Sequence, residues 1–393
     1  SSDDEGIETL IKYCEKGRWS NEEVLLRVQT HPNEAKHRSV AGTSPLHQAI
    51  LSFFPVNTID AIFNADLSAI KARGLFGCTP LHRAAQIAPL EVVNYFIEKA
   101  SFAFDIPDDS GDLPIHWACR GQNRSLVICA IIDKFPHHSS AKNKRGDNPL
   151  SSLSKIHNFQ WLSKTALCAN LTDGQQPLSL LRISSKTKGV NHSRYPLQEY
   201  WDNACILAKA VYMHSNGKLQ RRESLMMVHV CLSIFECPEH ILLLSLRINP
   251  EQLHTVDENG NLPLHLATAN VSIRCRSVTR YEIISCEGKD WDEAVVSTNE
   301  KYEEDNLLEK VLVLHPTAAC LANKYSEVPL MLALRSGMTW DSGVDKILFA
   351  ADNAALHRCG GLYPFMQAAI GDHACITTVY KLFRYYPELT RYT

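Results

Sequence analysis

The chain has 393 residues, of which 45% are hydrophobic, and a formal net charge of -3. This near-neutral charge excludes a protein-wide basic field of the kind that holds a nucleic-acid backbone, and the longest apolar stretches are too short to cross a membrane. The 13 cysteines are spread thinly without a Cys-x-x-Cys motif, which favours free thiols over a disulfide framework or a zinc ribbon. We therefore expect an intracellular protein, cytoplasmic or alternatively nuclear, that neither inserts into a membrane nor binds nucleic acid.

The first 35 residues predict one divergent pair of helices, because two apolar helical patterns precede the proline at position 32. From residue 36 onward a short phrase recurs, in which a glycine stands three residues before a proline and an apolar run follows. The glycine is present in seven of the eight copies and is replaced by Ser326 in the remaining one. The anchor prolines of these copies are Pro45, Pro80, Pro114, Pro149, Pro177, Pro263, Pro329 and Pro364.

Each anchor proline is expected in the first turn of a helix, where its missing N–H wastes no hydrogen bond and its fixed φ suits the helix. Ser44 and Thr79 directly precede two of these prolines and are expected to cap the helices. An alanine four residues after the proline, such as Ala84, would let neighbouring helices pack closely. A second proline, thirteen residues before the anchor, follows another apolar run and predicts a helix stop. These stop prolines are Pro32, Pro136, Pro250 and Pro316.

The regular spacing between anchors is 34 or 35 residues, and residues 78–84, Cys-Thr-Pro-Leu-His-Arg-Ala, closely resemble the signature of the ankyrin repeat family. The resemblance covers nearly the whole chain. It implies an all-α solenoid of about ten helix-turn-helix pairs with short hairpin loops, which binds other proteins through its hairpin tips and concave helical face. It also implies that a recurring histidine ties one hairpin to the next, at His47, His82, His116 and His265.

We expect a single repeat array over residues 1–393. Its expected parts are a divergent repeat (1–35), regular repeats (36–176), irregular repeats with a basic insert near 184–200 (177–262), a repeat with an acidic insert near 273–305 (263–328) and last repeats that end without a cap (329–393). Counting back from Pro263 by one 35-residue step places the anchor of a repeat without the signature at Val228. The missing cap predicts that further sequence or another chain covers the C-terminal end.

Partner proteins are expected to contact the hairpin tips, because exposed aromatic and arginine side chains often anchor interfaces. Phe76 and Tyr325 are the first aromatic candidates, with the alternative that each ring packs on the adjacent hairpin. The charged tips alternate in sign, which argues against a ligand of one charge. Trp291 lies in the acidic insert, where an aromatic side chain favours contact with a partner. The candidate partner-binding residues are Arg73, Phe76, Asp109, Lys144, Arg145, Glu258, Tyr325 and Trp291.

The sequence contains no nucleotide-binding, serine-hydrolase or metalloprotease motif, and we expect no catalytic residue, cofactor or metal site. Two Cys–His pairs, at 116/119 and 237/240, have a helical spacing but no third ligand or orienting carboxylate, and His137 and His138 are expected to face solvent. The sequence thus predicts a non-enzymatic scaffold or adaptor for protein–protein interaction. The alternatives are a regulatory or targeting segment of a larger enzyme or channel, a subunit of a stable multi-protein assembly, and a metal- or thiol-dependent enzyme with one abnormally acidic cysteine.

Overall fold

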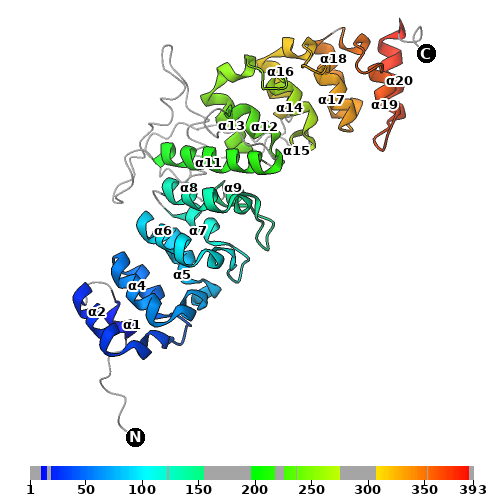
Figure 1. The fold of residues 1–393 in the computed structure, drawn as a ribbon. Coiled ribbons are helices and arrows are strands. Elements are labelled where there is room, and N and C mark those ends of the chain that lie inside the picture. Colours follow the sequence, from blue (N-terminus) through cyan, green and yellow to red (C-terminus); the bar gives the residue numbers. More distant parts are fainter. Residues whose placement is uncertain are drawn as a thin grey trace, which may run out of the picture. The chain divides into compact units, whose positions relative to one another are not determined.

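The computed structural model describes residues 10–15, 19–121, 124–154, 196–216, 225–235, 237–274, 307–351 and 353–388. Their contacts form two compact units. Unit 1 holds the described residues up to 154 and residues 198–216, and unit 2 holds residues 196–197 and 225–388. Within the described ranges the fold is all-α, as predicted, and its only β-type pairing is an isolated bridge between Cys359 and Leu362. Each unit is built from successive helix pairs (Figure 1).

Unit 1 contains four described pairs, each an inner helix followed by an outer helix. The pairs are α1 (Leu10–Tyr13) with α2 (Asn21–Thr30), α3 (Pro45–Leu51) with α4 (Val56–Ala65), α5 (Pro80–Ile87) with α6 (Leu90–Lys99), and α7 (Pro114–Arg120) with α8 (Ser125–Lys134). The next inner helix is α9 (Pro149–Ser154), and the longer α11 (Pro196–Asn216) also contributes to this unit. At the start of α8, Ser125 Oγ donates a hydrogen bond to Asn203 Oδ1 of α11 at 2.7 Å.

Unit 2 repeats the same plan with four described pairs. They are α12 (Met227–Ser233) with α13 (Glu239–Ile248), α14 (Pro263–Ala269) with α15 (Val271–Arg274) and α16 (Leu307–Leu314), α17 (Pro329–Arg335) with α18 (Val344–Ala350), and α19 (Pro364–Ala369) with α20 (Ile376–Tyr385). The outer helix of the α14 repeat is thus in two pieces. The expected acidic insert falls between them, almost wholly outside the described residues.

Seven of the eight anchor prolines start inner helices as predicted, and Pro177 lies outside the described residues. A proline is the first residue of α3, α5, α7, α9, α14, α17 and α19. At α5 the backbone N–H of Thr79 donates to Nδ1 of His82 at 3.0 Å, and at α3 the N–H of His47 donates to Oγ of Ser44 at 3.3 Å. The histidine therefore takes the place that Glu or Gln holds in an ordinary capping box, and the expected caps are confirmed.

The stop prolines end the outer helices and each opens a short 3₁₀ turn, which the sequence did not predict. These turns are η1 (Pro32–Lys36), η5 (Pro136–Ser140), η8 (Pro250–His254) and η10 (Pro316–Cys320). Similar turns without a leading proline are η2 (Leu67–Lys71) and η4 (Ser101–Asp105), and η3 (Leu75–Gly77), η11 (Trp340–Ser342) and η12 (Ala354–Leu356) are shorter. The turn carries the chain from each outer helix into the next hairpin tip.

The core of each unit lies between inner helices that pack in series. In unit 1 the series runs α3, α5, α7 and α9, and in unit 2 it runs α12, α14, α17 and α19. The alanines predicted at the contacts are buried, with exposures of 1% at Ala84 and 0% at Ala118. Leu153, which stands in the corresponding position of α9, is also fully buried. A larger side chain at these alanines would overpack the contact and cost about 1–3 kcal/mol.

Two boundaries differ from the sequence prediction. The repeat without the signature begins at Met227, one residue before the predicted Val228, because α12 starts there and His229 takes the position of the recurring histidine. The last residues of the expected basic insert, 196–200, are helical and open α11, while its basic residues lie outside the described ranges.

Candidate functional site

The hairpin tips share one construction. In four tips an Asp or Asn accepts the backbone N–H groups of the residues two and four positions later, at 2.8–3.0 Å, and these residues are Asp108, Asn143, Asp257 and Asn323. The left-handed backbone position is a glycine in three of these tips, such as Gly111 with φ 79°, and in the fourth Ser326 adopts the same conformation with φ 59°. A Cβ atom at Gly111 would stand 2.9 Å from the backbone nitrogen of Lys144 in the next tip, so neighbouring tips touch there.

Neighbouring tips are bonded to each other through several of the predicted residues. In unit 1, Lys144 Nζ donates to the carbonyl of Asp109 at 2.7 Å, and Arg73 Nη1 forms an ion pair with Asp109 at 3.3 Å. In unit 2, Lys324 Nζ donates to the carbonyl of Glu258 at 2.7 Å. The alternating charges that the sequence offers to a partner are therefore partly used between the tips themselves.

Phe76 differs from these bonded residues because its side chain is open. The residue is 71% exposed and adopts φ 59° and ψ 22°. This left-handed conformation costs about 1–2 kcal/mol for a residue with a side chain. Its carbonyl accepts the N–H of Asp109 at 3.1 Å, which fixes the backbone while leaving the ring outside. The exposure of 71% leaves most of this side chain open rather than packed on the adjacent hairpin.

Tyr325 is held more firmly than Phe76. It is 65% exposed, and its hydroxyl donates to Asn259 Oδ1 of the neighbouring tip at 3.4 Å. Trp291 lies outside the described residues. The structure thus places Arg73, Asp109 and Lys144 together on successive tips of unit 1, and Glu258 and Tyr325 on tips of unit 2.

The recurring histidines have both ring nitrogens engaged. Nε2 of His82 donates to the carbonyl of Asp112 in the next tip at 2.8 Å, while Nδ1 accepts the N–H of Thr79. His47, His116 and His265 repeat both contacts with their own neighbours, which confirms the predicted structural role. His229 makes the same Nε2 contact to the carbonyl of Asn261 at 3.3 Å, and it could not be predicted from the motif because no proline precedes it there.

Burial lowers the pKa of each of these histidines. The pKa of His47 falls from 6.5 to about 4, and those of His82, His116, His229 and His265 are also lowered. A proton added to Nδ1 of His82 would face the N–H of Thr79 instead of a lone pair. These imidazoles are therefore neutral connectors at pH 7, and both ring nitrogens are bonded in His47, His82, His116 and His265, whereas Nδ1 of His229 is buried without a hydrogen-bond partner among the described residues.

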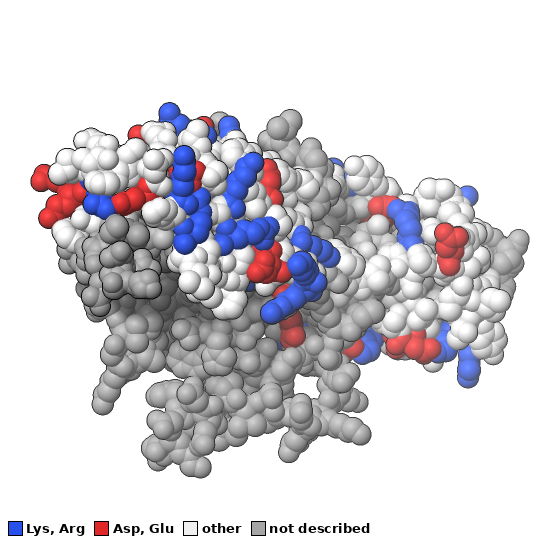
Figure 2. Space-filling view, turned by 90° about the horizontal axis from the view of Figure 1, so that it is seen from below, with Lys and Arg blue, Asp and Glu red and all other residues white. Residues whose placement is uncertain are grey.

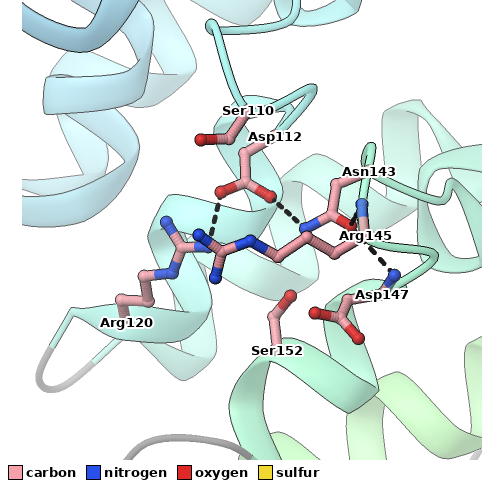
Figure 3. A pocket seen from close by; sticks show the side chains of 7 residues that line it. All are labelled: Ser110, Asp112, Arg120, Asn143, Arg145, Asp147 and Ser152. Atoms are coloured by element: carbon pink, nitrogen blue, oxygen red, sulfur yellow. Dashed lines mark hydrogen bonds and ion pairs between the residues drawn. The ribbon is translucent and has the colours of Figure 1, made fainter.

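A cavity of about 450 Å³ lies between two tips and two inner helices of unit 1 (Figure 3). Asp112 is 2% exposed and accepts hydrogen bonds from Asn143 Nδ2 at 2.7 Å and Arg120 Nη2 at 2.5 Å. Burial alone would raise the pKa of this carboxyl, but those two bonds outweigh it and lower the pKa. The cavity is lined by Ser110, Asp112, Arg120, Asn143, Arg145, Asp147 and Ser152.

Arg145 is the unpaired charge at this cavity. Its side chain is exposed and points toward that of Arg120 from the opposite wall, and among the described residues its guanidinium has no ion pair or hydrogen bond (Figure 3). Figure 2 shows one face of the molecule, on which Lys and Arg side chains gather with Asp and Glu among them, so the charge of that face is mixed. The guanidinium of Arg145 can donate two parallel hydrogen bonds to one carboxylate, while the charge of Arg120 is already neutralised by Asp112. The cavity therefore suits a single carboxylate.

The pair of Cys119 and His116 lacks a reactive thiol and a free imidazole. Cys119 is fully buried, burial raises its pKa to about 12, and His116 is fully bonded elsewhere. One thiol in the described part of the chain, Cys375, does have a lowered pKa, because the side-chain hydroxyl of Thr378 donates to its sulfur at 3.2 Å. A hydroxyl is not a general base, so this acidic cysteine alone does not favour the enzyme alternative.

Iodoacetamide is expected to modify Cys375 well before the buried Cys14 and Cys119, whose pKa values burial raises to about 12. The thiolate is the reacting form, and only Cys375 of these three gains it more readily than a free thiol. Peptide mass spectrometry of a labelling time course at pH 7 measures the rates. Thr378→Val should slow the labelling of Cys375 while Thr378→Ser keeps it, and equal rates at Cys375 and Cys119 in the folded protein would contradict the account.

His138 corrects one sequence expectation. His137 is 59% exposed on its side chain, as expected, but that of His138 is only 2% exposed and contacts Asp105. The doublet therefore does not face solvent as a whole.

None of the helices in the described part of the chain is long and apolar enough to cross a membrane.

Comparison with known proteins matches residues 76–109 to the Ankyrin repeat family. A stretch of 101 residues is 30% identical to the Ankyrin repeat and ELMO domain-containing protein D of Dictyostelium discoideum. That stretch covers 25% of this chain and 8% of the relative, so the chain spans a small part of the relative's length. The family match takes in the tip at Phe76 with α5, α6 and η4, and the wider resemblance along the chain stays a prediction.

Proposed function

We propose that this chain, which carries an ankyrin repeat at residues 76–109, is a non-enzymatic scaffold or adaptor that binds partner proteins through its hairpin tips and the adjoining concave helical face. Ankyrin repeats generally mediate protein–protein interaction. The observation that carries the proposal is a contrast between tip residues. Arg73, Asp109 and Lys144 bond the tips to one another, whereas Phe76 and Arg145 stay exposed.

The bonded tips favour binding because they are ordered before a partner arrives. Association costs about 0.5–1.5 kcal/mol for each flexible side chain that must be fixed, and a preformed surface avoids part of that cost. Phe76 offers a large apolar area on a fixed backbone, which suits an anchor residue. The strain at Phe76 also favours a role beyond packing, since a glycine would fit this conformation without it.

The cavity beside Arg145 suggests the chemistry of the contact. An acidic side chain of the partner would enter between the two tips and meet the open guanidinium of Arg145, with Arg120 behind it. Asp112 keeps Arg120 compensated, so the cavity would accept one negative charge rather than an acidic cluster. We place the protein in the cytoplasm, with the nucleus as the alternative compartment.

Co-purification from the native source with identification by mass spectrometry supplies the partner, and its affinity is then measured against purified variants. Changing Phe76, Arg145 and Tyr325 together to alanine should weaken binding about thirtyfold or more, because loss of an interface anchor costs at least about 2 kcal/mol. The matched control changes three exposed outer-helix residues, Lys99, Phe349 and Tyr380, to alanine. Full affinity in the tip variant, with loss in the control variant, would overturn the proposal.

A second candidate function is that of a regulatory or targeting segment within a larger protein. One observation favours it, namely that the relative's name joins ankyrin repeats to a further domain and that the match covers 8% of its length. The mass of the native protein, measured from its source, tests this candidate. A mass far above 44.1 kDa would support it, and a mass equal to that value would contradict it.

A further inference from the structure

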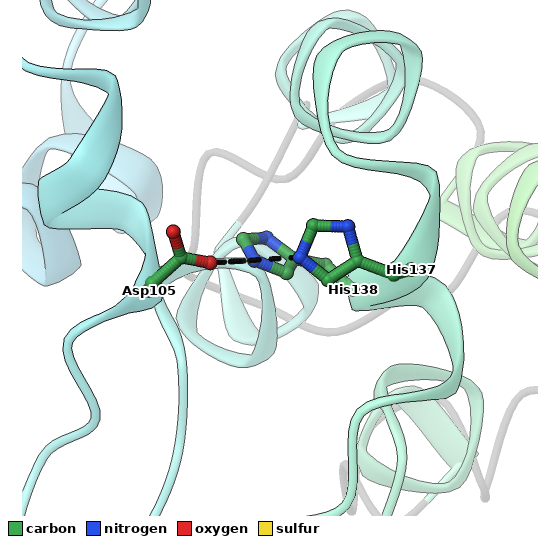
Figure 4. Close-up of side chains that lie close together, drawn as sticks. All are labelled: Asp105, His137 and His138. Atoms are coloured by element: carbon green, nitrogen blue, oxygen red, sulfur yellow. Dashed lines mark hydrogen bonds and ion pairs between the residues drawn. The ribbon is translucent and has the colours of Figure 1, made fainter.

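We propose that Asp105, His137 and His138 form a binding site for a divalent transition-metal ion, with Zn²⁺ as the best-fitting ion. The carboxylate lies at the end of η4, and the two histidines lie in η5, one repeat further on. Their candidate ligand atoms all lie within 4.8 Å of one another, and they are the one such cluster of three found in the described residues. One oxygen of Asp105 faces both imidazole rings (Figure 4).

The distances suit a small ion after a slight opening. Oδ1 of Asp105 lies 3.5 Å from Nε2 of His137 and 2.7 Å from Nε2 of His138. A tetrahedral Zn²⁺ with bonds of about 2.0–2.1 Å holds its ligand atoms ~3.3 Å apart. The first distance already fits, and the second would lengthen by about half an ångström as the ion replaces the shared proton. Asp105 and His137 are 57% and 59% exposed and can turn to allow this.

His138 is the preorganised ligand of the three. Its side chain is 2% exposed, and its ring stacks on Phe135 with centroids 5.0 Å apart, so its orientation is fixed. Among the described residues, Nδ1 of His138 is buried without a hydrogen-bond partner, so packing rather than hydrogen bonding at that nitrogen sets the ring's position.

The ligand set selects the class of ion. Two imidazole nitrogens and one carboxylate oxygen suit Zn²⁺ and similar transition metals, whereas Ca²⁺ and Mg²⁺ prefer oxygen ligands alone. Three protein ligands leave at least one position for water on the exposed side. Because the ligands come from two successive repeats, the ion would clamp those repeats together and make the stability of unit 1 depend on metal.

The test uses the full chain, freed of metal by a chelator and titrated with zinc chloride against a chromophoric competitor. His137→Gln and Asp105→Asn should each weaken the site about tenfold or more, while the exposed His37→Gln should bind as the wild type does. When the free zinc concentration is a hundred times the dissociation constant, the midpoint temperature of thermal unfolding should rise by about 5 °C in the wild type and in His37→Gln, but not in the other two variants.

Cobalt(II) spectra separate this site from the protein's thiols, because the proposed ligands give no thiolate charge-transfer band. A wild-type chain that binds no zinc, or His137→Gln and Asp105→Asn variants that bind it as tightly as the wild type, would overturn the proposal. A bound cobalt ion with a thiolate band that is unchanged in His137→Gln would overturn it as well.

Discussion

Replacing Arg124 with methionine is expected to lower the free energy of unfolding by about 3 kcal/mol, because this buried arginine caps the end of the preceding inner helix. Arg124 is 7% exposed, and its guanidinium donates to the carbonyls of Ala85 at 3.0 Å, Ala84 at 3.1 Å and Ala88 at 2.7 Å. These acceptors lie at the C-terminal end of α5 and just beyond it, where a cation is also favoured by the helix dipole. Removal of the side chain leaves the carbonyls buried without their charged donor.

Urea unfolding of Arg124→Met measures this change, and Arg145→Met is the matched control. Arg145 is exposed and its guanidinium has no bond to the described residues, so its loss should change stability by less than about 0.5 kcal/mol. The two variants should therefore separate stability from binding. An Arg124→Met protein as stable as the wild type would show that the contact from one repeat to the next contributes little.

The free energy of unfolding is expected to fall steadily as the pH is lowered from about 6.5 to about 4. The five recurring histidines have lowered pKa values in the folded state, so the unfolded chain binds more protons in this window. Their contribution is fully present above the unfolded pKa of 6.5 and is lost as the pH falls, and for His47 the loss is complete near pH 4. Each histidine adds a slope of about 1.4 kcal/mol per pH unit while it titrates in one state only.

Urea midpoints across this pH range measure the slope. His82→Gln removes one titrating group and should give a shallower slope than the wild type, whatever its absolute stability, while Arg145→Met should keep the wild-type slope. The carboxylates Asp66 and Asp112 have pKa values lowered from 3.8. The stability that they contribute is therefore lost only at a pH below the range in which the histidines titrate. Constant stability between pH 6.5 and 4 would contradict the neutral state of the histidines.

The sequence predicted the helix starts and stops because proline acts locally. Pro80 fixes φ in its own first turn, and Thr79 and His82 complete the cap within three residues. Ser326 shows that the left-handed turn does not require a glycine, because it adopts the same backbone conformation. The anchor at Met227 was misplaced by one residue because no proline marks it, and only the contact of His229 across 32 residues fixes the register.

The candidate site was predictable in part. Phe76 and Arg145 followed from the tip register alone, but the bonding of Arg73 to Asp109 did not, because it joins residues 36 apart in sequence. The same distance in sequence hid the cap by Arg124, which reaches back 36 to 40 residues, and the approach of Asp105 to His138. Contacts between repeats depend on how the units stack, which no local pattern contains.

Photo-crosslinking from position 76 tests the binding surface most directly. Phe76 is replaced by benzoylphenylalanine in the full chain, and a second protein carries the same group at Phe349, which is 64% exposed on the outer helix α18. If partners bind at the hairpin tips, position 76 should crosslink to a protein that also co-purifies with the wild type, and position 349 should not crosslink to that protein. A co-purifying partner that crosslinks from position 349 and not from position 76 would contradict it and place the interface on the outer helices.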